Sequence, residues 1–170
     1  PRLLSSAASD VYKRQHPNDS SPLGLRNTAF AIHMGENDSL YNRNDMAVKW
    51  GNDLKKLNEE DPEGYRHYIK IYKNKGHWMD NLEASALDWM SDFIRNPYPS
   101  KVVWKQGNVL HKRFYWLKNE NPSVGDLIEC IIDDQIITVL SSSSSKIIIQ
   151  LNDHLVDMLS LIHISEPTRR

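Results

Sequence analysis

The stretch AFAIHMGEND, residues 29–38, decides how the chain folds. Its first half is a short apolar run, typical of a strand that is covered on both faces, as in a parallel sheet. Gly35 ends the run and allows a tight turn that closes at Asp38. A second stretch, HYIKIYKNKGH at residues 67–77, alternates like a strand and then runs into a loop that ends in His77. The sequence therefore predicts two strands, each followed by a loop that presents an ionisable side chain.

Helical patterns follow both predicted strands. The first helix is expected to be capped by Asn42 or Asn44, and its apolar stripe consists of Met46, Trp50, Leu54 and Leu57. A second helix is expected to begin at a cap on Asp80 or Asn81 and to run to about Ile94. The order strand, helix, strand, helix with short loops indicates an α/β layer structure.

After Pro99 the pattern changes to a period of two residues, which predicts a small all-β appendage. Hairpin-turn chemistry is found at residues 133–135, and the serine run 141–145 is expected to be an exposed loop. The strand candidates are residues 101–105, 113–117, 127–132, 136–140 and 147–151. We therefore expect an α/β domain over residues 16–99 and a β appendage over residues 100–158.

The two ends of the chain do not match the rest. Residues 1–15 and 159–170 closely resemble translated sequencing-adapter read-through, as found in metagenomic gene predictions, and such segments are excluded from reasoning about the fold. The native part is then expected to run from about His16 to Met158 and to be cut at both ends. A native N-terminus missing in this way leaves cytoplasmic, periplasmic and secreted bacterial locations all open.

Composition excludes several classes of function. A net charge of −1 provides no electrostatic footprint for nucleic acid, and no apolar run is long enough for a membrane span. The single Cys130 rules out an internal disulfide, and its apolar surroundings predict a small buried side chain. No Cys/His spacing suggests zinc, so neither a metal nor a cofactor is expected. The oligomeric state is not indicated.

Asp38 and His77 are the candidate catalytic residues. Loops at the carboxyl ends of strands are where chemistry sits in an open α/β sheet. An Asp that orients a His is the acid–base half of a nucleophilic triad, in which the imidazole takes the proton of a serine hydroxyl. Several alternatives remain open. Asp38 could be a turn residue with His77 on the surface, or Glu36 could be the acid instead of Asp38. Asp80 could cap a helix, pair with His77 or bind a metal, and His33 is expected to be a hydrogen-bonded structural residue.

The turns Gly35-Glu36-Asn37-Asp38 and Gly76-His77 resemble the C-terminal end of an α/β-hydrolase, closest to the prolyl-oligopeptidase and dienelactone-hydrolase-like serine esterases and peptidases. The resemblance covers roughly Leu25 to Asn96. In that family the triad follows the chain order Ser, Asp, His. The resemblance implies a truncated hydrolase sheet with helices, Asp38 as the triad acid and His77 as the general base. It also implies a small-molecule ester or peptide substrate, and no cofactor.

One departure from that family is large. The chain contains no Gly-x-Ser-x-Gly, the sharp turn that exposes the nucleophile. The chain itself is therefore expected to lack hydrolase activity, whatever its parent protein does. The rival hypothesis is a non-catalytic module, in which the β appendage binds carbohydrate or protein and the α/β part is a scaffold. The aromatic residues Trp104, Phe114, Tyr115 and Trp116 suggest that hypothesis, although alternating strand aromatics also form cores.

Overall fold

The structure is a computed structural model that describes residues 21–159. The chain divides into two compact units, with the boundary between Asn96 and Pro97. Apart from Leu159, the residues expected to be adapter sequence lie outside the described residues, as do residues 16–20 of the expected α/β domain.

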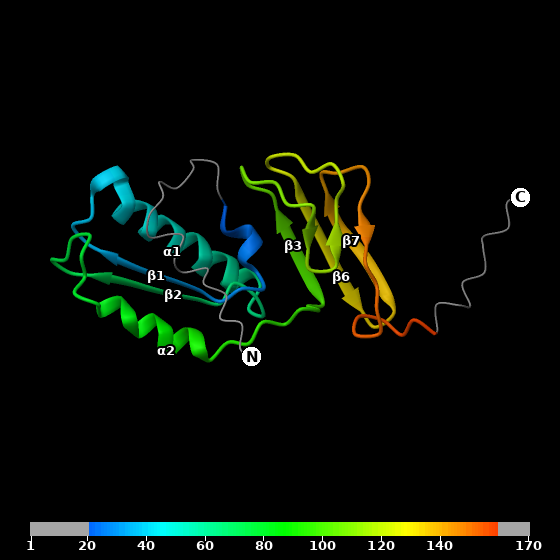
Figure 1. The fold of residues 1–170 in the computed structure, drawn as a ribbon, viewed down its shortest axis with the longest axis horizontal. Coiled ribbons are helices and arrows are strands. Elements are labelled where there is room, and N and C mark those ends of the chain that lie inside the picture. The colour runs from blue at the N-terminus through cyan, green and yellow to red at the C-terminus, as the bar shows by residue number, and fades with distance from the viewer. Residues whose placement is uncertain (1–20, 160–170) are drawn as a thin grey trace, which may run out of the picture. The chain divides into compact units, whose positions relative to one another are not determined.

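In the first unit, strands β1 (Phe30–Gly35) and β2 (His67–Tyr72) form a parallel pair in which Phe30 lies opposite His67. Helix α1 (Arg43–Glu60) connects them and packs against both strands. Helix α2 (Ser85–Ser91) follows β2, and Figure 1 shows the two helices on opposite sides of the pair. From residue 21 onward, the unit also contains three short 3-10 helices: η2 (Pro22–Leu25), η3 (Leu40–Asn42) and η4 (Leu82–Ala84).

Alternate side chains of β1 point to opposite faces of the parallel pair, and the two faces have different contacts. Phe30 and Ile32 are buried in one cluster with Leu54 of α1, which is 0% exposed. Gly51 allows the close contact between α1 and β2, because a Cβ there would lie 3.1 Å from the side chain of Ile69. His33 belongs to the other face, where its ring contacts those of two tyrosines on β2.

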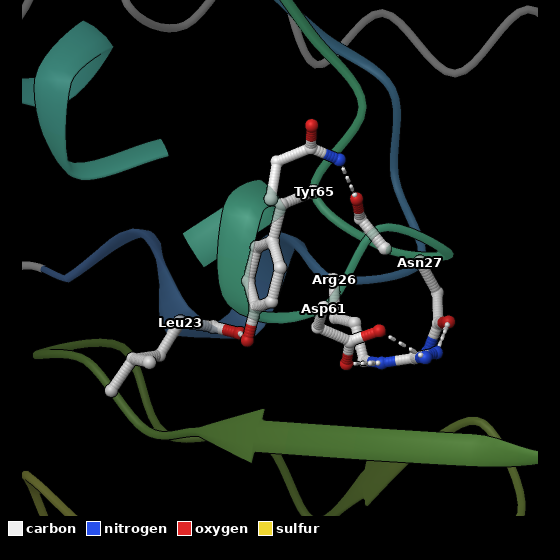
Figure 2. A network of polar contacts seen from close by, with 7 residues as sticks. Leu23, Arg26, Asn27, Asp61 and Tyr65 are labelled. Atoms are coloured by element: carbon white, nitrogen blue, oxygen red, sulfur yellow. Dashed lines mark hydrogen bonds and ion pairs between the residues drawn. The ribbon is translucent and has the colours of Figure 1, made fainter. Parts of the chain in front are cut away.

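A polar network anchors the start of the first unit (Figure 2). Arg26 donates two hydrogen bonds to the carboxylate of Asp61, at 2.7 and 2.9 Å, and the Arg26 side chain is only 6% exposed. Asn27 accepts a further bond from the same guanidinium. The hydroxyl of Tyr65 donates to the carbonyl oxygen of Leu23 at 3.1 Å. Residues 22–27 are therefore held against the end of α1 and the loop before β2.

The second unit contains two antiparallel sheets of three strands, in the orders β3-β6-β7 and β4-β5-β8. Ile128, Cys130 and Ile132 alternate along β6 and enter a core with Trp104 and Trp116. The strands are β3 (Lys101–Lys105), β4 (Arg113–Phe114), β5 (Leu117–Lys118), β6 (Leu127–Asp133), β7 (Ile136–Ser142) and β8 (Ile148–Ile149).

The expected fold class, a truncated α/β-hydrolase sheet with helices, is wrong. The described residues form one parallel pair and two antiparallel sheets, with two α-helices, and 25% of these residues are helical and 27% in strands. The strand–helix–strand order of residues 29–77 specifies a single parallel pair, and no other described strand joins it. In the second unit, two-residue turns join β4 to β5 and β6 to β7, and two-residue turns join antiparallel strands only.

Several local expectations were also wrong. The second helix begins at Ser85, because Asp80 and Asn81 adopt left-handed conformations (φ 54° and 61°) that a right-handed helix does not continue from. Neither Asn42 nor Asn81 makes a side-chain cap hydrogen bond. A turn with Tyr115 at φ 52° divides the expected strand 113–117 into β4 and β5. The first two serines of the run 141–145 belong to β7 rather than to a loop.

Candidate active site

The candidate site forms where the loops after β1 and β2 meet, and Gly35 makes this meeting possible. A Cβ at residue 35 would collide with the backbone carbonyl of Gly76 and would lie 2.5 Å from the carbonyl oxygen of Lys75. Real Cβ atoms do not approach that closely, so any other residue would push the loops apart. The glycine is needed for close approach of two loops, in addition to the tight turn expected from the sequence.

Backbone hydrogen bonds join the two loops. The N–H of Glu36 donates to the carbonyl of Tyr72 at 3.0 Å, and the N–H of Asn37 donates to that of Lys75 at 2.8 Å. In return, the N–H of Asn74 donates to the Glu36 carboxylate at 2.9 Å. These bonds extend the pairing of β1 and β2 beyond the strand ends, and they bring residues 38 and 77 to the same place.

Asp38 and His77 lie within hydrogen-bond distance of each other. The Nδ1 atom of His77 is 2.9 Å from Oδ2 of Asp38. The carboxylate is buried, with its side chain 4% exposed, whereas the imidazole is 37% exposed. The expectation that these side chains meet is confirmed, and their catalytic role remains a prediction. A buried acid that orients a half-exposed imidazole has the geometry of the acid–base half of a triad.

Arg43, the first residue of α1, is a third member of the site that the sequence analysis missed. Its Nη1 atom lies 3.2 Å from Oδ1 of Asp38 and 3.1 Å from Nδ1 of His77. A cation in the first turn of a helix opposes the helix dipole, so it needs an acidic partner nearby. That unfavourable position, five residues after Asp38, is the signal in the sequence that could have found it.

The contacts of His77 Nδ1 cannot both be hydrogen bonds at once. A carboxylate only accepts and a guanidinium only donates. Nδ1 must therefore carry a proton to bond Asp38, and must lack one to accept from Arg43. The contact with Asp38 is the shorter and joins a buried anion to a donor, so it determines the proton position. The proton then lies on Nδ1, and Nε2 carries the lone pair that can accept a second proton.

His33 lies beneath α2 and has surroundings of a different kind. The Tyr72 hydroxyl donates to the carbonyl of Leu82 at 2.7 Å, so it accepts from Nδ1 of His33 at 3.0 Å. Burial lowers the pKa of His33, and the positive charge of Lys70 lowers it further. The expected hydrogen bond of His33 is confirmed, and its purely structural role remains a prediction. Within the described residues, its buried Nε2 atom has no hydrogen-bond partner.

The remaining candidates have other roles in the described structure. The carboxylate of Asp80 pairs with Lys75 at 2.6 Å and does not cap a helix. Glu36 accepts the backbone N–H of Asn74, as part of the connection between the loops. Trp78 directly follows His77 and is 79% exposed, so it is not a core residue.

The second unit contains two features of the kind that can form binding sites, namely strand aromatics and a pocket. Trp104 and Trp116 are each 2% exposed, so their rings belong to the core and do not present a carbohydrate-binding surface. A pocket of about 380 Å³ lies beside the stacked rings of Tyr98 and His154. Among residues 21–159, no group of three or more His, Cys, Asp or Glu residues is placed to hold a metal ion.

Comparison of the chain with protein-family models, with curated proteins and with solved structures finds no match. Within the described part of the chain, no helix is both long and apolar enough to cross a membrane.

Proposed function

We propose that Asp38 and His77 are the acid and the general base of a serine-hydrolase triad that acts on a carboxylic ester or a peptide bond. The observation that carries the proposal is the 2.9 Å contact between a buried carboxylate and a half-exposed imidazole on two loops that are joined by backbone hydrogen bonds. The resemblance of the two turns to those of serine hydrolases supports the same roles. The serine nucleophile belongs to a parent protein, so the chain alone is expected to be inactive.

Each side chain has a defined role in this mechanism. His77 takes the proton of the attacking serine at Nε2 and later returns it to the leaving group. Asp38 accepts the Nδ1 proton, which selects the tautomer and stabilises the positive charge that develops on the ring. Carboxylate and imidazole suffice for this proton transfer, and no cofactor takes part.

The tautomer of His77 provides a direct test on the full chain, because it does not require the nucleophile. We expect ¹⁵N NMR of the imidazole to place the proton on Nδ1 at neutral pH. In Asp38→Asn, Arg43 should attract the amide oxygen, so that the amide NH₂ faces Nδ1 and the proton moves to Nε2. Asp53→Asn, which alters an exposed partner of Lys49 on α1, should leave the tautomer unchanged. A wild-type proton on Nε2 would overturn the assignment.

The nucleophile provides the second test. We expect the source DNA upstream of the codons for residues 28–80 to encode a Gly-x-Ser-x-Gly turn in frame, in place of the adapter-like residues 1–15. Long-read sequencing across both ends of the reading frame checks this, and the longer protein should then cleave p-nitrophenyl esters. A native coding sequence without such a serine would remove the hydrolase proposal and favour a non-catalytic binding module.

A further inference from the structure

The charge balance of the candidate site differs from that of a simple acid–base pair. In such a pair, the negative carboxylate compensates the positive charge that the imidazole gains with a second proton. Here the Arg43 guanidinium already contacts the Asp38 carboxylate at 3.2 Å, and the same nitrogen lies 3.1 Å from the ring nitrogen of His77. A second proton on the ring would place its positive charge beside that of Arg43, and the two charges would share the buried Asp38 carboxylate.

Arg43 has a second contact on its other side. Its guanidinium lies 5.3 Å from the ring centroid of Tyr41, which is within the range of cation–π interactions. Tyr41 is 58% exposed, and its backbone is left-handed with φ 59°. This uncommon conformation belongs to the turn that leads directly into α1. The guanidinium therefore has a second partner, whose contact it can keep when it leaves the carboxylate.

We propose that Arg43 is a positioning residue that restrains the Asp38–His77 pair and keeps the imidazole weakly reactive until the guanidinium leaves the carboxylate and keeps only its contact with the ring of Tyr41. This inference rests on the proposed function and assigns a regulatory element to the same site. In the restrained state, Asp38 divides its two oxygens between Arg43 and His77. In the released state, the whole carboxylate charge stabilises the imidazolium that forms when Nε2 takes up a proton.

The test measures the reactivity of His77 toward diethyl pyrocarbonate, a reagent that acylates neutral imidazole nitrogen. The full chain is treated at pH 8, where an ordinary imidazole is neutral, and modification of each histidine is followed by peptide mass spectrometry. We expect Arg43→Met, which removes the charge and keeps most of the apolar stem, to raise the rate at His77 roughly threefold or more. Arg43→Lys, which keeps a cation, should remain near the wild-type rate.

Controls separate release of the carboxylate from loss of structure. Lys49→Met removes a cation from the same helix, where it pairs with the exposed Asp53, and should change nothing at His77. The rates at His33 and His67 should stay constant in Arg43→Met, because unfolding would raise them together with that of His77. In Asp38→Asn/Arg43→Met the gain should disappear, because it depends on the carboxylate.

An unchanged or lower rate in Arg43→Met would overturn the inference. A gain that persists in the double variant would overturn it as well, because the gain would then reflect exposure of the ring. The proposed function has a separate criterion, which is that Asp38→Asn alone slows modification of His77 by removing the Nε2 lone pair. If Asp38→Asn has no effect, the acid–base pair itself fails. If Asp38→Asn slows modification of His77 but Arg43→Met does not accelerate it, the proposed restraint by Arg43 is wrong and the acid–base pair still stands.

Discussion

His33 shows how the surroundings of one residue set its protonation. Burial lowers the pKa of the imidazole, Lys70 lowers it further, and the carboxylate of Glu83 acts in the opposite direction. Nδ1 of His33 already carries the proton that it donates to the Tyr72 hydroxyl. A second proton can therefore bind only at the buried Nε2 atom. A second proton on the His33 ring would therefore be buried beneath α2 in the folded protein, so folding disfavours the doubly protonated imidazole.

This pKa shift has a predictable effect on stability. Because the folded-state pKa of His33 lies below the unfolded value of about 6.5, the unfolded chain binds the proton more readily, and stability falls as the pH drops below that value. We expect urea unfolding of the first unit to show this loss between neutral pH and pH 5. His33→Gln should reduce the pH dependence, and Lys70→Met should reduce it in part. An identical pH profile in wild type and His33→Gln would contradict the prediction.

Individual residues were predictable from the sequence where their neighbours in the chain defined their surroundings. Cys130, flanked by apolar residues, was expected to be buried; it is 0% exposed, and burial raises the pKa of its thiol to about 11. Asp38 and His77 were predictable because each follows a strand. Arg43 was not predicted, because its role depends on two side chains that come together only through the contact between loops.

At the scale of elements, Gly35 and Gly76 look alike in sequence but differ in their surroundings. A Cβ at residue 35 would collide with the backbone of the loop after β2, whereas a Cβ at residue 76 would meet nothing within 4 Å. The backbone atoms that Gly35 faces cannot rotate away as a flexible side chain can. Gly35 therefore determines how close the loops after β1 and β2 come to each other, and Gly76 does not.

The two glycines form a matched pair of variants. We expect Gly35→Ala to push the loops apart, to lower the free energy of unfolding by about 1–3 kcal/mol and to abolish the Nδ1 tautomer of His77. Gly76→Ala should change stability by less than about 0.5 kcal/mol and keep the tautomer. Urea denaturation and ¹⁵N NMR of the two variants check these outcomes. Equal effects of the two substitutions would show that Gly35 has no special steric role.

Elements with a strong pattern were predicted well. Strand β3 has the expected bounds, β2 begins at the expected His67, and α1 buries Leu54 from the expected apolar stripe. The failures have conformational causes: left-handed residues such as Asp80 and Tyr115 interrupt elements where the hydrophobic pattern continues. Such conformations are uncommon outside glycine and asparagine, so they leave little trace in the pattern of residue types.

At the scale of the whole molecule, the described chain has two separate hydrophobic cores. Leu54 is fully buried in the cluster that joins α1 to β1 and β2, and Leu117 is fully buried in the cluster of the second unit. No residue is shared by the two clusters. Each core is small, so each unit depends strongly on its few fully buried side chains.

Truncation of either leucine tests this division. We expect Leu54→Ala and Leu117→Ala each to cost about 2–5 kcal/mol through lost packing and a residual cavity. Amide hydrogen exchange should become faster in β1 and β2 for the first variant, and in β5 and β6 for the second. The two effects should be additive within about 0.5 kcal/mol in the double variant. A larger coupling, or faster exchange in the other unit, would contradict two independent cores.

The fold class was the main error of prediction from the sequence. The pattern of residues 29–72 specifies a parallel pair crossed by a helix, and that pair is present. Periodicity reports which face of an element is buried, but it does not report how many strands join the same sheet. The alternating strands after Pro99 pair among themselves and not with β1 or β2. One strand–helix–strand unit therefore does not imply a larger α/β sheet.

Trp78 also makes the candidate site visible to spectroscopy. Its indole ring meets the imidazole of His77 edge to face, with 5.9 Å between the ring centroids, and it is 79% exposed. Solvent-exposed indoles emit at longer wavelengths than the buried Trp104 and Trp116, and a charged imidazolium nearby quenches indole fluorescence. Trp78 is the most exposed of the five tryptophans, so the red edge of the emission spectrum is expected to change when the imidazole beside it gains a proton. Fluorescence can therefore follow proton uptake at the proposed site without any added ligand.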